Sequence, residues 1–167
     1  MKALTVRQPW AWAIAHGTKR TENRPRRMSY RGSLWLHAGA RSRWDPAAES
    51  SPLVLGDWAQ YRHDHVPGWP GLPDSDVTLG RKTTLMPFGA VVAQVTVTGC
   101  HWWEDCKAGD ERPAAMCSPW AVRGQFHIEL ANAVRLLAAP VPCKGALSLW
   151  TVPAAAETAV RAQMEDK

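Results

Sequence analysis

Two stretches of the chain show the residue patterns that are typical of β-strands. In residues 33–38, Leu34, Leu36 and Ala38 alternate with other residues and form one wholly apolar face. Residues 89–99, GAVVAQVTVTG, are rich in β-branched side chains and are bracketed by glycines. We therefore expect a strand in each stretch. Three shorter runs also favour strands, at residues 3–7, 125–130 and 145–152.

Helical signals lie between these runs. Pro9 stands where the first turn of a helix tolerates proline, and Gly17 is placed to end that helix in a left-handed conformation. Residues 45–59 can form a second helix, which Pro52 and Gly56 interrupt. We expect two helices here, the first of them short.

The remaining segments define the domain. Residues 61–88 have no usable period, so we expect a loop or an insertion there. Residues 153–167 are predicted to form a C-terminal tail or a short helix. Residues 1–152 are then a single domain, of a usual size for one core. Short, widely spaced strands with little β–α–β rhythm predict an α+β fold: a small, mostly antiparallel β-barrel with flanking helices.

Charge is distributed unevenly along this chain. Residues 1–43 contain ten Lys or Arg and a single acid, Glu22, whereas residues 44–167 contain ten bases and fourteen acids. The formal net charge of +5 therefore comes from one end. Such a field attracts polyanions, and nucleic acid is the natural partner.

Membrane and secretory segments are not expected. No run approaches the eighteen or so apolar residues of a membrane helix, and the first residues lack the apolar run of a signal peptide. We expect a soluble, cytoplasmic monomer that needs no cofactor.

The four cysteines, Cys100, Cys106, Cys117 and Cys143, are expected to be reduced thiols, since nothing indicates secretion. Their spacing matches no common zinc motif, although His101 lies beside the first of them. We therefore predict no metal site.

The segment from Lys19 to Arg24 holds the strongest candidates for chemistry. Lys19 can hold a phosphate, or act as a base or nucleophile if burial lowers its pKa. Glu22 either orients a neighbouring cation or acts as a general acid/base, and we favour the orienting role. Arg24 offers a planar fork to an anion, and the Asn23 amide offers a donor and an acceptor to a base edge. Surface or turn-stabilising roles remain the alternatives.

Two further groups could contact nucleic acid. Arg26, Arg27 and Arg31 follow Pro25 on an expected exposed turn, which either binds backbone phosphates or is merely solubilising. Trp12 is our best candidate for stacking on a base, which is worth about 1–3 kcal/mol per base. The alternative for Trp12 is packing within its helix.

Three ordered motifs resemble the ASCH domain family, a branch of the PUA-like superfamily. The first lies in VRQPWAWAIAHGTKRTENR, where Gly17, Lys19, Glu22 and Arg24 fill the family pattern. The second is YRG at residues 30–32, and the third is PCKG at residues 142–145 before Leu149-Trp150. The resemblance implies a β-barrel with a cleft lined by the Lys/Glu/Arg motif and associated with RNA, DNA or nucleoside ligands.

We consider three functions and favour the first. The first is a binding module whose basic cleft accepts RNA or a nucleotide. The second, implied by the resemblance, is an amidohydrolase acting on N4-acylated cytidine through a lysine, a threonine three residues later and a distant glutamate. Glu22 occupies the threonine position here, Thr21 is one residue away, and Glu104 or Glu111 would have to supply the glutamate. The third is a ribonuclease in which Lys19 and Arg24 stabilise phosphoryl charge while His37 or Glu22 transfers protons.

Overall fold

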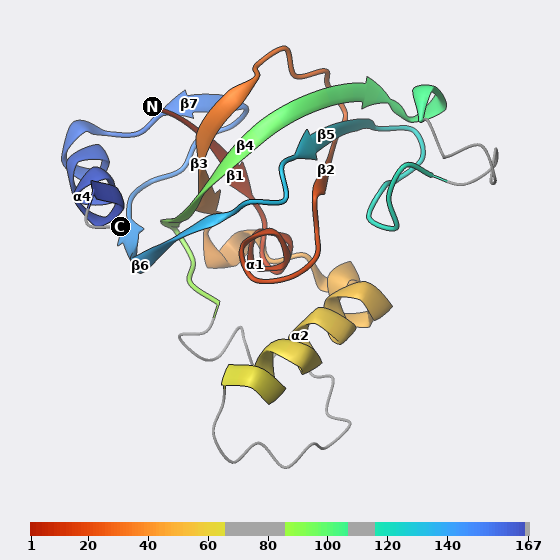
Figure 1. Cartoon of the computed structure of the whole chain (residues 1–167), viewed down its shortest axis with the longest axis horizontal. Coiled ribbons are helices and arrows are strands. Elements are labelled where there is room, and N and C mark those ends of the chain that lie inside the picture. Colours follow the sequence, from red (N-terminus) through yellow and green to blue (C-terminus); the bar gives the residue numbers. More distant parts are fainter. Residues whose placement is uncertain (66–85, 107–115, 166–167) are drawn as a thin grey trace.

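The computed structural model describes residues 1–65, 86–106 and 116–165 (Figure 1). Its strands are β1 (Lys2–Val6), β2 (Thr21–Arg24), β3 (Gly32–Ala38), β4 (Ala90–Trp102), β5 (Phe126–Leu130), β6 (Arg135–Pro142) and β7 (Leu149–Thr151). Its α-helices are α1 (Trp10–Ala15), α2 (Pro52–His65) and α4 (Ala154–Glu165). Short 3₁₀ helices occur at η1 (Arg41–Arg43), η2 (Pro46–Ser50) and η3 (Trp103–Asp105).

All seven strands belong to one sheet, with the order β2-β5-β4-β3-β1-β7. The pairs are antiparallel apart from β1 with β3. The long strand β4 pairs with β3 along one edge and divides its other edge between β6 and β5. The expected α+β class and the mostly antiparallel pairing are therefore confirmed.

The sheet is open, so the closed barrel that we expected is not observed. Strands β2 and β7 end the pairing order, and no backbone ladder joins them in the described part of the chain. Strand β1 has both edges occupied, one by β3 and the other by β7, so it has no edge left for β2. The four-residue strand β2 therefore pairs with β5 alone and has one free edge.

Buried side chains form three clusters around this sheet. Leu34 and Leu36 of β3 pack with Ile14 of α1 in the first, whereas Trp35 of the same strand packs with Val160 of α4 in another. Strand β3 is thus buried on both faces; Figure 1 shows its place in the sheet beside β1 and β4. The tryptophan-rich cluster lies beside α1 and α2 and contains Trp12, Ala13, Trp44, Ala48, Val54, Trp58, Met86 and Trp120.

Several element predictions need correction. Residues 61–65 continue α2, so the proposed loop at 61–88 is wrong at its start, and residues 66–85 lie outside the described residues. Strand β2 was missed because TENR is short and polar, and β6 because its two prolines argue against a strand. Of the two alternatives predicted for the C-terminal segment, a tail or a short helix, the structure has the helix, α4.

A tight turn after α1 carries the chain into β2. Gly17 does not have the positive φ that we expected, and its role is steric instead. A Cβ there would lie 2.1 Å from Asp57 Oδ2 and 2.9 Å from the Ala13 carbonyl oxygen. The Asp57 carboxylate accepts hydrogen bonds from the backbone N–H of Thr18 at 2.7 Å and from its hydroxyl at 3.1 Å. This turn places Lys19 at the start of the site.

Candidate nucleotide-binding cavity

A cavity of about 990 Å³ lies beside β2. Strands β1 and β3 contribute Thr5 and His37 to its wall, and the loops before β5 and β7 contribute further lining residues. Lys19, Glu22 and Arg24 of the first motif line it together with Asn23. The sequence thus identified four residues that share one concave surface.

Lys19 is almost fully buried, with 2% of its surface exposed. Its ammonium donates a hydrogen bond to the Thr21 carbonyl and lies 3.7 Å from Glu22 Oε2. The same nitrogen is 5.5 Å from the ring centroids of both Trp10 and Trp120. Burial lowers the pKa of Lys19, and the nearby Glu22 carboxylate opposes this effect only in part. Lys19 is therefore a desolvated cation close to the rings of two indoles that contact each other.

Glu22 and Arg24 form a fixed pair on the same strand. Arg24 Nε donates to Glu22 Oε1 at 3.0 Å, and Arg24 Nη2 donates to the Thr5 carbonyl at 2.6 Å. Glu22 therefore contacts both neighbouring cations, as the orienting role requires. Arg24 also joins β2 to β1 across the open side of the sheet.

Asn23 has a different position from the one that we expected. Its Nδ2 donates to the Trp120 carbonyl at 2.8 Å, and its Oδ1 accepts from the Val122 backbone N–H at 3.0 Å. Both ends of the amide are thus bonded to the loop before β5. Asn23 holds that loop against β2, so reading a base edge would require breaking these bonds.

Trp12 is not at the cavity, and its predicted stacking role is wrong. Only 1% of its surface is exposed, and its ring packs edge-on against Trp58 at 5.0 Å in the tryptophan-rich cluster. The aromatic residues of the cavity are Trp10 and Trp120, whose rings meet edge to face at 6.3 Å. Trp10 Nε1 is held by Asp45 Oδ2 at 3.0 Å.

The charged rim is also different from the predicted one. Arg26, Arg27 and Arg31 are exposed but do not line the cavity, and Arg31 donates to the carbonyls of its own turn. Three cations that the sequence did not single out do line it: Arg7, Arg43 and Lys144. The cavity wall therefore presents five Lys or Arg side chains and two carboxylates, those of Glu22 and Asp45.

The third motif lines the cavity where it lies against β1 and β3. His37 is buried, donates a hydrogen bond from Nε2–H to the Cys143 carbonyl at 3.1 Å, and packs edge-on against Trp150. A Cβ at Gly145 would lie 2.4 Å from His37 Cε1, so only glycine fits there. Burial lowers the pKa of His37, and the Cys143 carbonyl opposes this, so the ring is neutral at neutral pH.

A scan against protein-family models matches residues 4–138 to the ASCH domain. The match covers most of the chain and contains the whole of the first motif. The chain belongs to the ASCH domain family. A search of curated proteins finds no match for it.

The residues of the family motif can be located in the structure of this ASCH domain. Lys19, Glu22 and Arg24 occupy one edge strand and its approach, and all three contact one another or the cavity wall. Membership also makes a nucleic-acid-related role the consistent general assignment. Among the described residues, no helix combines the length and apolar character needed to cross a bilayer.

Proposed function

We propose that this ASCH domain binds RNA by accepting one nucleotide in the cavity beside β2. The observation that carries the proposal is the buried Lys19 ammonium close to Trp10 and Trp120 at the wall of a cavity of about 990 Å³. Specific ligand sites commonly have about 300–1,000 Å³, so one nucleotide fits within this range. Desolvated cations bind anions more strongly than exposed cations do.

The parts of a nucleotide have distinct partners in this proposal. The phosphate is held by the exposed rim cations Arg43 and Lys144, while the base packs against the indole of Trp10. Flanking phosphates of a longer RNA reach the turn that holds Arg26 and Arg27, which follows Pro25 of the cavity wall. A mononucleotide is too short to use this turn.

Two double variants with the same change in charge test this arrangement. Arg43→Ala with Lys144→Ala removes rim cations, and Arg26→Ala with Arg27→Ala removes cations outside the cavity. The rim pair should weaken mononucleotide binding by about tenfold or more, since hydrogen bonds to charged groups are worth about 1.5–3 kcal/mol. The turn pair should leave mononucleotide binding unchanged, as measured by calorimetric titration.

Binding of single-stranded RNA further distinguishes the role of the rim cations from that of the turn cations. With RNA, the turn pair should lower the slope of log K against log salt concentration by about 0.7 for each phosphate that the protein no longer neutralises. Equal weakening by both variants with both ligands would mean that only overall charge matters. Absence of RNA binding by the unmodified protein at low salt would refute the proposal outright.

A second candidate function is hydrolysis of the amide in N4-acylated cytidine. The observation that favours it is the burial of Lys19, which lowers the pKa of its ammonium and so makes a neutral amine more accessible. The rest of the expected machinery is not at the cavity. Glu22 is paired with two cations, Thr21 and Glu104 do not line the wall, and Glu111 lies outside the described residues.

Incubation with N4-acetylcytidine tests this second candidate directly. Chromatography should show free cytidine if the reaction occurs, and Lys19→Met should abolish its release. Thr5→Ala and Ser148→Ala probe the hydroxyl groups that line the cavity. No cytidine above the buffer control would leave binding as the function of Lys19.

Ribonuclease activity has one supporting observation of its own. His37 Nδ1 is buried and has no hydrogen-bond partner among the described residues, and its ring lines the same cavity as Lys19. A Lys19→Ala protein that cleaves RNA as fast as the unmodified chain would exclude the mechanism predicted for this activity.

A further inference from the structure

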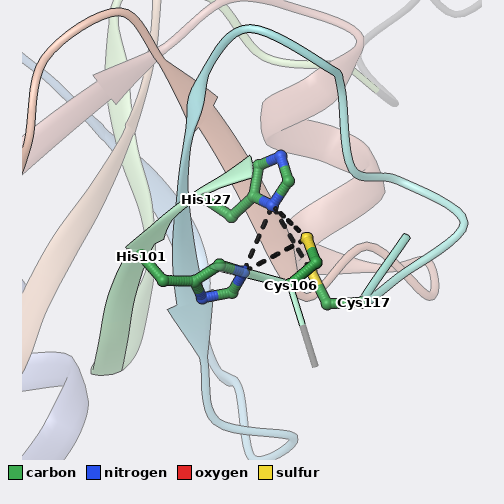
Figure 2. A group of neighbouring side chains, drawn as sticks. All are labelled: His101, Cys106, Cys117 and His127. Atoms are coloured by element: carbon green, nitrogen blue, oxygen red, sulfur yellow. Dashed lines mark hydrogen bonds between the residues drawn. The ribbon is translucent and has the colours of Figure 1, made fainter. Parts of the chain in front are cut away.

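Four potential metal ligands gather at the end of the sheet where β4 and β5 leave their ladder. His101 and His127 are directly opposite each other in the register of these antiparallel strands. Cys106 follows η3, and Cys117 lies eleven positions further along the chain. Figure 2 shows the two thiols and the two imidazoles pointing toward one another. None of these residues lines the cavity described above.

The spacing of the four ligand atoms resembles that of a tetrahedral zinc centre. His127 Nδ1 lies 3.3 Å from His101 Nε2, 3.2 Å from Cys106 Sγ and 3.3 Å from Cys117 Sγ. Cys106 Sγ is 3.5 Å from His101 Nε2, and all four atoms lie within 4.8 Å of one another. Zn–N bonds of about 2.0–2.1 Å and Zn–S bonds of about 2.3 Å give tetrahedron edges of about 3.3–3.8 Å.

The outer nitrogens of both histidines already have acceptors. His101 Nδ1 lies 2.6 Å from Glu129 Oε1, and His127 Nε2 lies 2.9 Å from the Val122 carbonyl. Each acceptor holds a proton on the outer nitrogen, so the inner nitrogens present lone pairs. Carboxylate and carbonyl partners of this kind orient the histidine ligands of metal sites.

A bound cation would explain why the inner nitrogens and the two sulfur atoms lie so close together. The two lone pairs face each other at 3.3 Å, which is repulsive without a positive charge between them. Thiol protons could satisfy each nitrogen separately, but S–H groups are weak donors. One divalent cation instead binds both nitrogens and both thiolates at once, and thiolate with imidazole is the donor set that zinc prefers.

We propose that His101, Cys106, Cys117 and His127 bind one Zn²⁺ ion. Four protein ligands leave no open position, so the ion has a structural role and takes no part in a reaction. Its effect is to fix the segment from Cys117 to β5 against the sheet. That segment carries Trp120 to the cavity wall, and Val122 joins His127 to Asn23 through its carbonyl and its N–H.

This proposal revises our prediction from the sequence that the chain has no metal site. That prediction considered mainly the cysteine spacing, and Cys100 and Cys143 do not belong to the cluster. The missing information was the β4–β5 register, which brings His127 opposite His101. A pair of histidines flanking two cysteines was the available signal.

Metal analysis of the full-length protein tests the proposal. Protein prepared with zinc and passed through gel filtration should retain one zinc per chain by elemental mass spectrometry. Replacement with Co²⁺ should give visible d–d bands of a tetrahedral site together with near-ultraviolet thiolate charge transfer. Glu129→Gln should weaken zinc binding by about 10–100-fold, the usual cost of removing an outer partner.

Thiol variants provide the matched control. Cys106→Ser and Cys117→Ser should each lower zinc retention and the thiolate charge-transfer intensity, whereas Cys143→Ser should change neither. The cobalt spectrum of the unmodified chain decides the question even if a ligand variant does not fold. No retained zinc in that chain, or full retention in a Cys106→Ser, Cys117→Ser double variant, would overturn the proposal.

Discussion

Lys19 is the residue on which the site depends most directly. Its ammonium is surrounded by two indoles, a carbonyl and one carboxylate, and water reaches little of it. Burial of a cation opposes folding, and the contacts with Glu22 and the rings offset part of that cost. The burial of Lys19 is therefore a cost to stability that the proposed ligand-binding role would explain.

The pH dependence of stability should reveal this cost. Because burial lowers the pKa of folded Lys19, the folded chain holds fewer protons than the unfolded chain between the lowered pKa and the ordinary value of 10.5. Stability due to Lys19 therefore rises with pH in that window. As pH rises toward 10.5, the free energy of unfolding of the natural chain should increase relative to that of Lys19→Met. Urea titration measures both values.

An exposed lysine supplies the comparison for this measurement. Lys144→Met should give a curve parallel to that of the natural chain, since its side chain is exposed. A constant difference between the natural chain and Lys19→Met at every pH would contradict a lowered pKa.

Two glycines, one in the turn after α1 and one inside α2, should respond in opposite directions to alanine. At Gly17 a Cβ meets Asp57 and the Ala13 carbonyl, so Gly17→Ala should destabilise the fold by about 1–3 kcal/mol. At Gly56, inside α2, nothing lies within 4 Å, so Gly56→Ala should stabilise by about 0.5–1 kcal/mol. Thermal unfolding measures both, and equal shifts would reject the steric role of Gly17.

Residue predictions succeeded where chemistry is local in the chain. Lys19, Glu22 and Arg24 are close in sequence, and a lone carboxylate among cations has to pair with them. Trp12 was misplaced because in a chain with ten tryptophans the pattern of one helix does not say which ring reaches the surface. Arg7, Arg43 and Lys144 were missed because folding alone brings them together.

At the scale of elements, β2 and the loop before β5 work as one unit. The strand is short and has a single neighbour, so its position depends on side-chain contacts as well as its ladder. Asn23 supplies the main contact by bonding Trp120 and Val122 in the loop. Removal of this amide leaves a carbonyl and an N–H without their partner.

Asn23→Ala should therefore loosen the cavity wall. We expect the free energy of unfolding to fall by about 0.5–1.5 kcal/mol, the usual net contribution of a hydrogen bond, and amide exchange to accelerate at Val122. Exposed Asn132→Ala is the control and should change neither quantity. Unaltered exchange at Val122 in Asn23→Ala would show that other contacts hold the loop.

Strands with a clear apolar pattern were easier to predict from the sequence than strands without one. Strands β3 and β4 were evident from buried β-branched and aliphatic residues, and both are observed. Strand β2 has no such pattern because Glu22, Asn23 and Arg24 line the cavity, where polar side chains are expected. A hydrophobic pattern cannot identify a strand of this kind.

At the scale of the whole molecule, a side-chain contact rather than a backbone ladder connects the two sides of the open sheet. Strands β2 and β1 are separated in the sheet by β5, β4 and β3, yet Arg24 reaches from one to the other. The sequence predicted the class of fold but not this gap, because strand order depends on long-range pairing that no local pattern encodes.

Arg24→Met should test how much this bridge contributes. Loss of its bonds to Glu22 and the Thr5 carbonyl should lower the free energy of unfolding by about 1.5–3 kcal/mol and abolish nucleotide binding. Arg27→Met, on the exposed turn, should leave the stability within about 0.5 kcal/mol of the natural value. Denaturant titration and calorimetry give both results, and a stable, binding-competent Arg24→Met protein would assign the closure to other residues.

The short path from His127 through Val122 to Asn23 has a thermodynamic consequence. Two ligands that stabilise the same loop conformation must favour each other equally, because coupling free energies are reciprocal. A zinc ion at the proposed site would therefore be retained more firmly when a nucleotide occupies the cavity. At limiting zinc, the nucleotide-bound form of the protein would be the last to lose the ion.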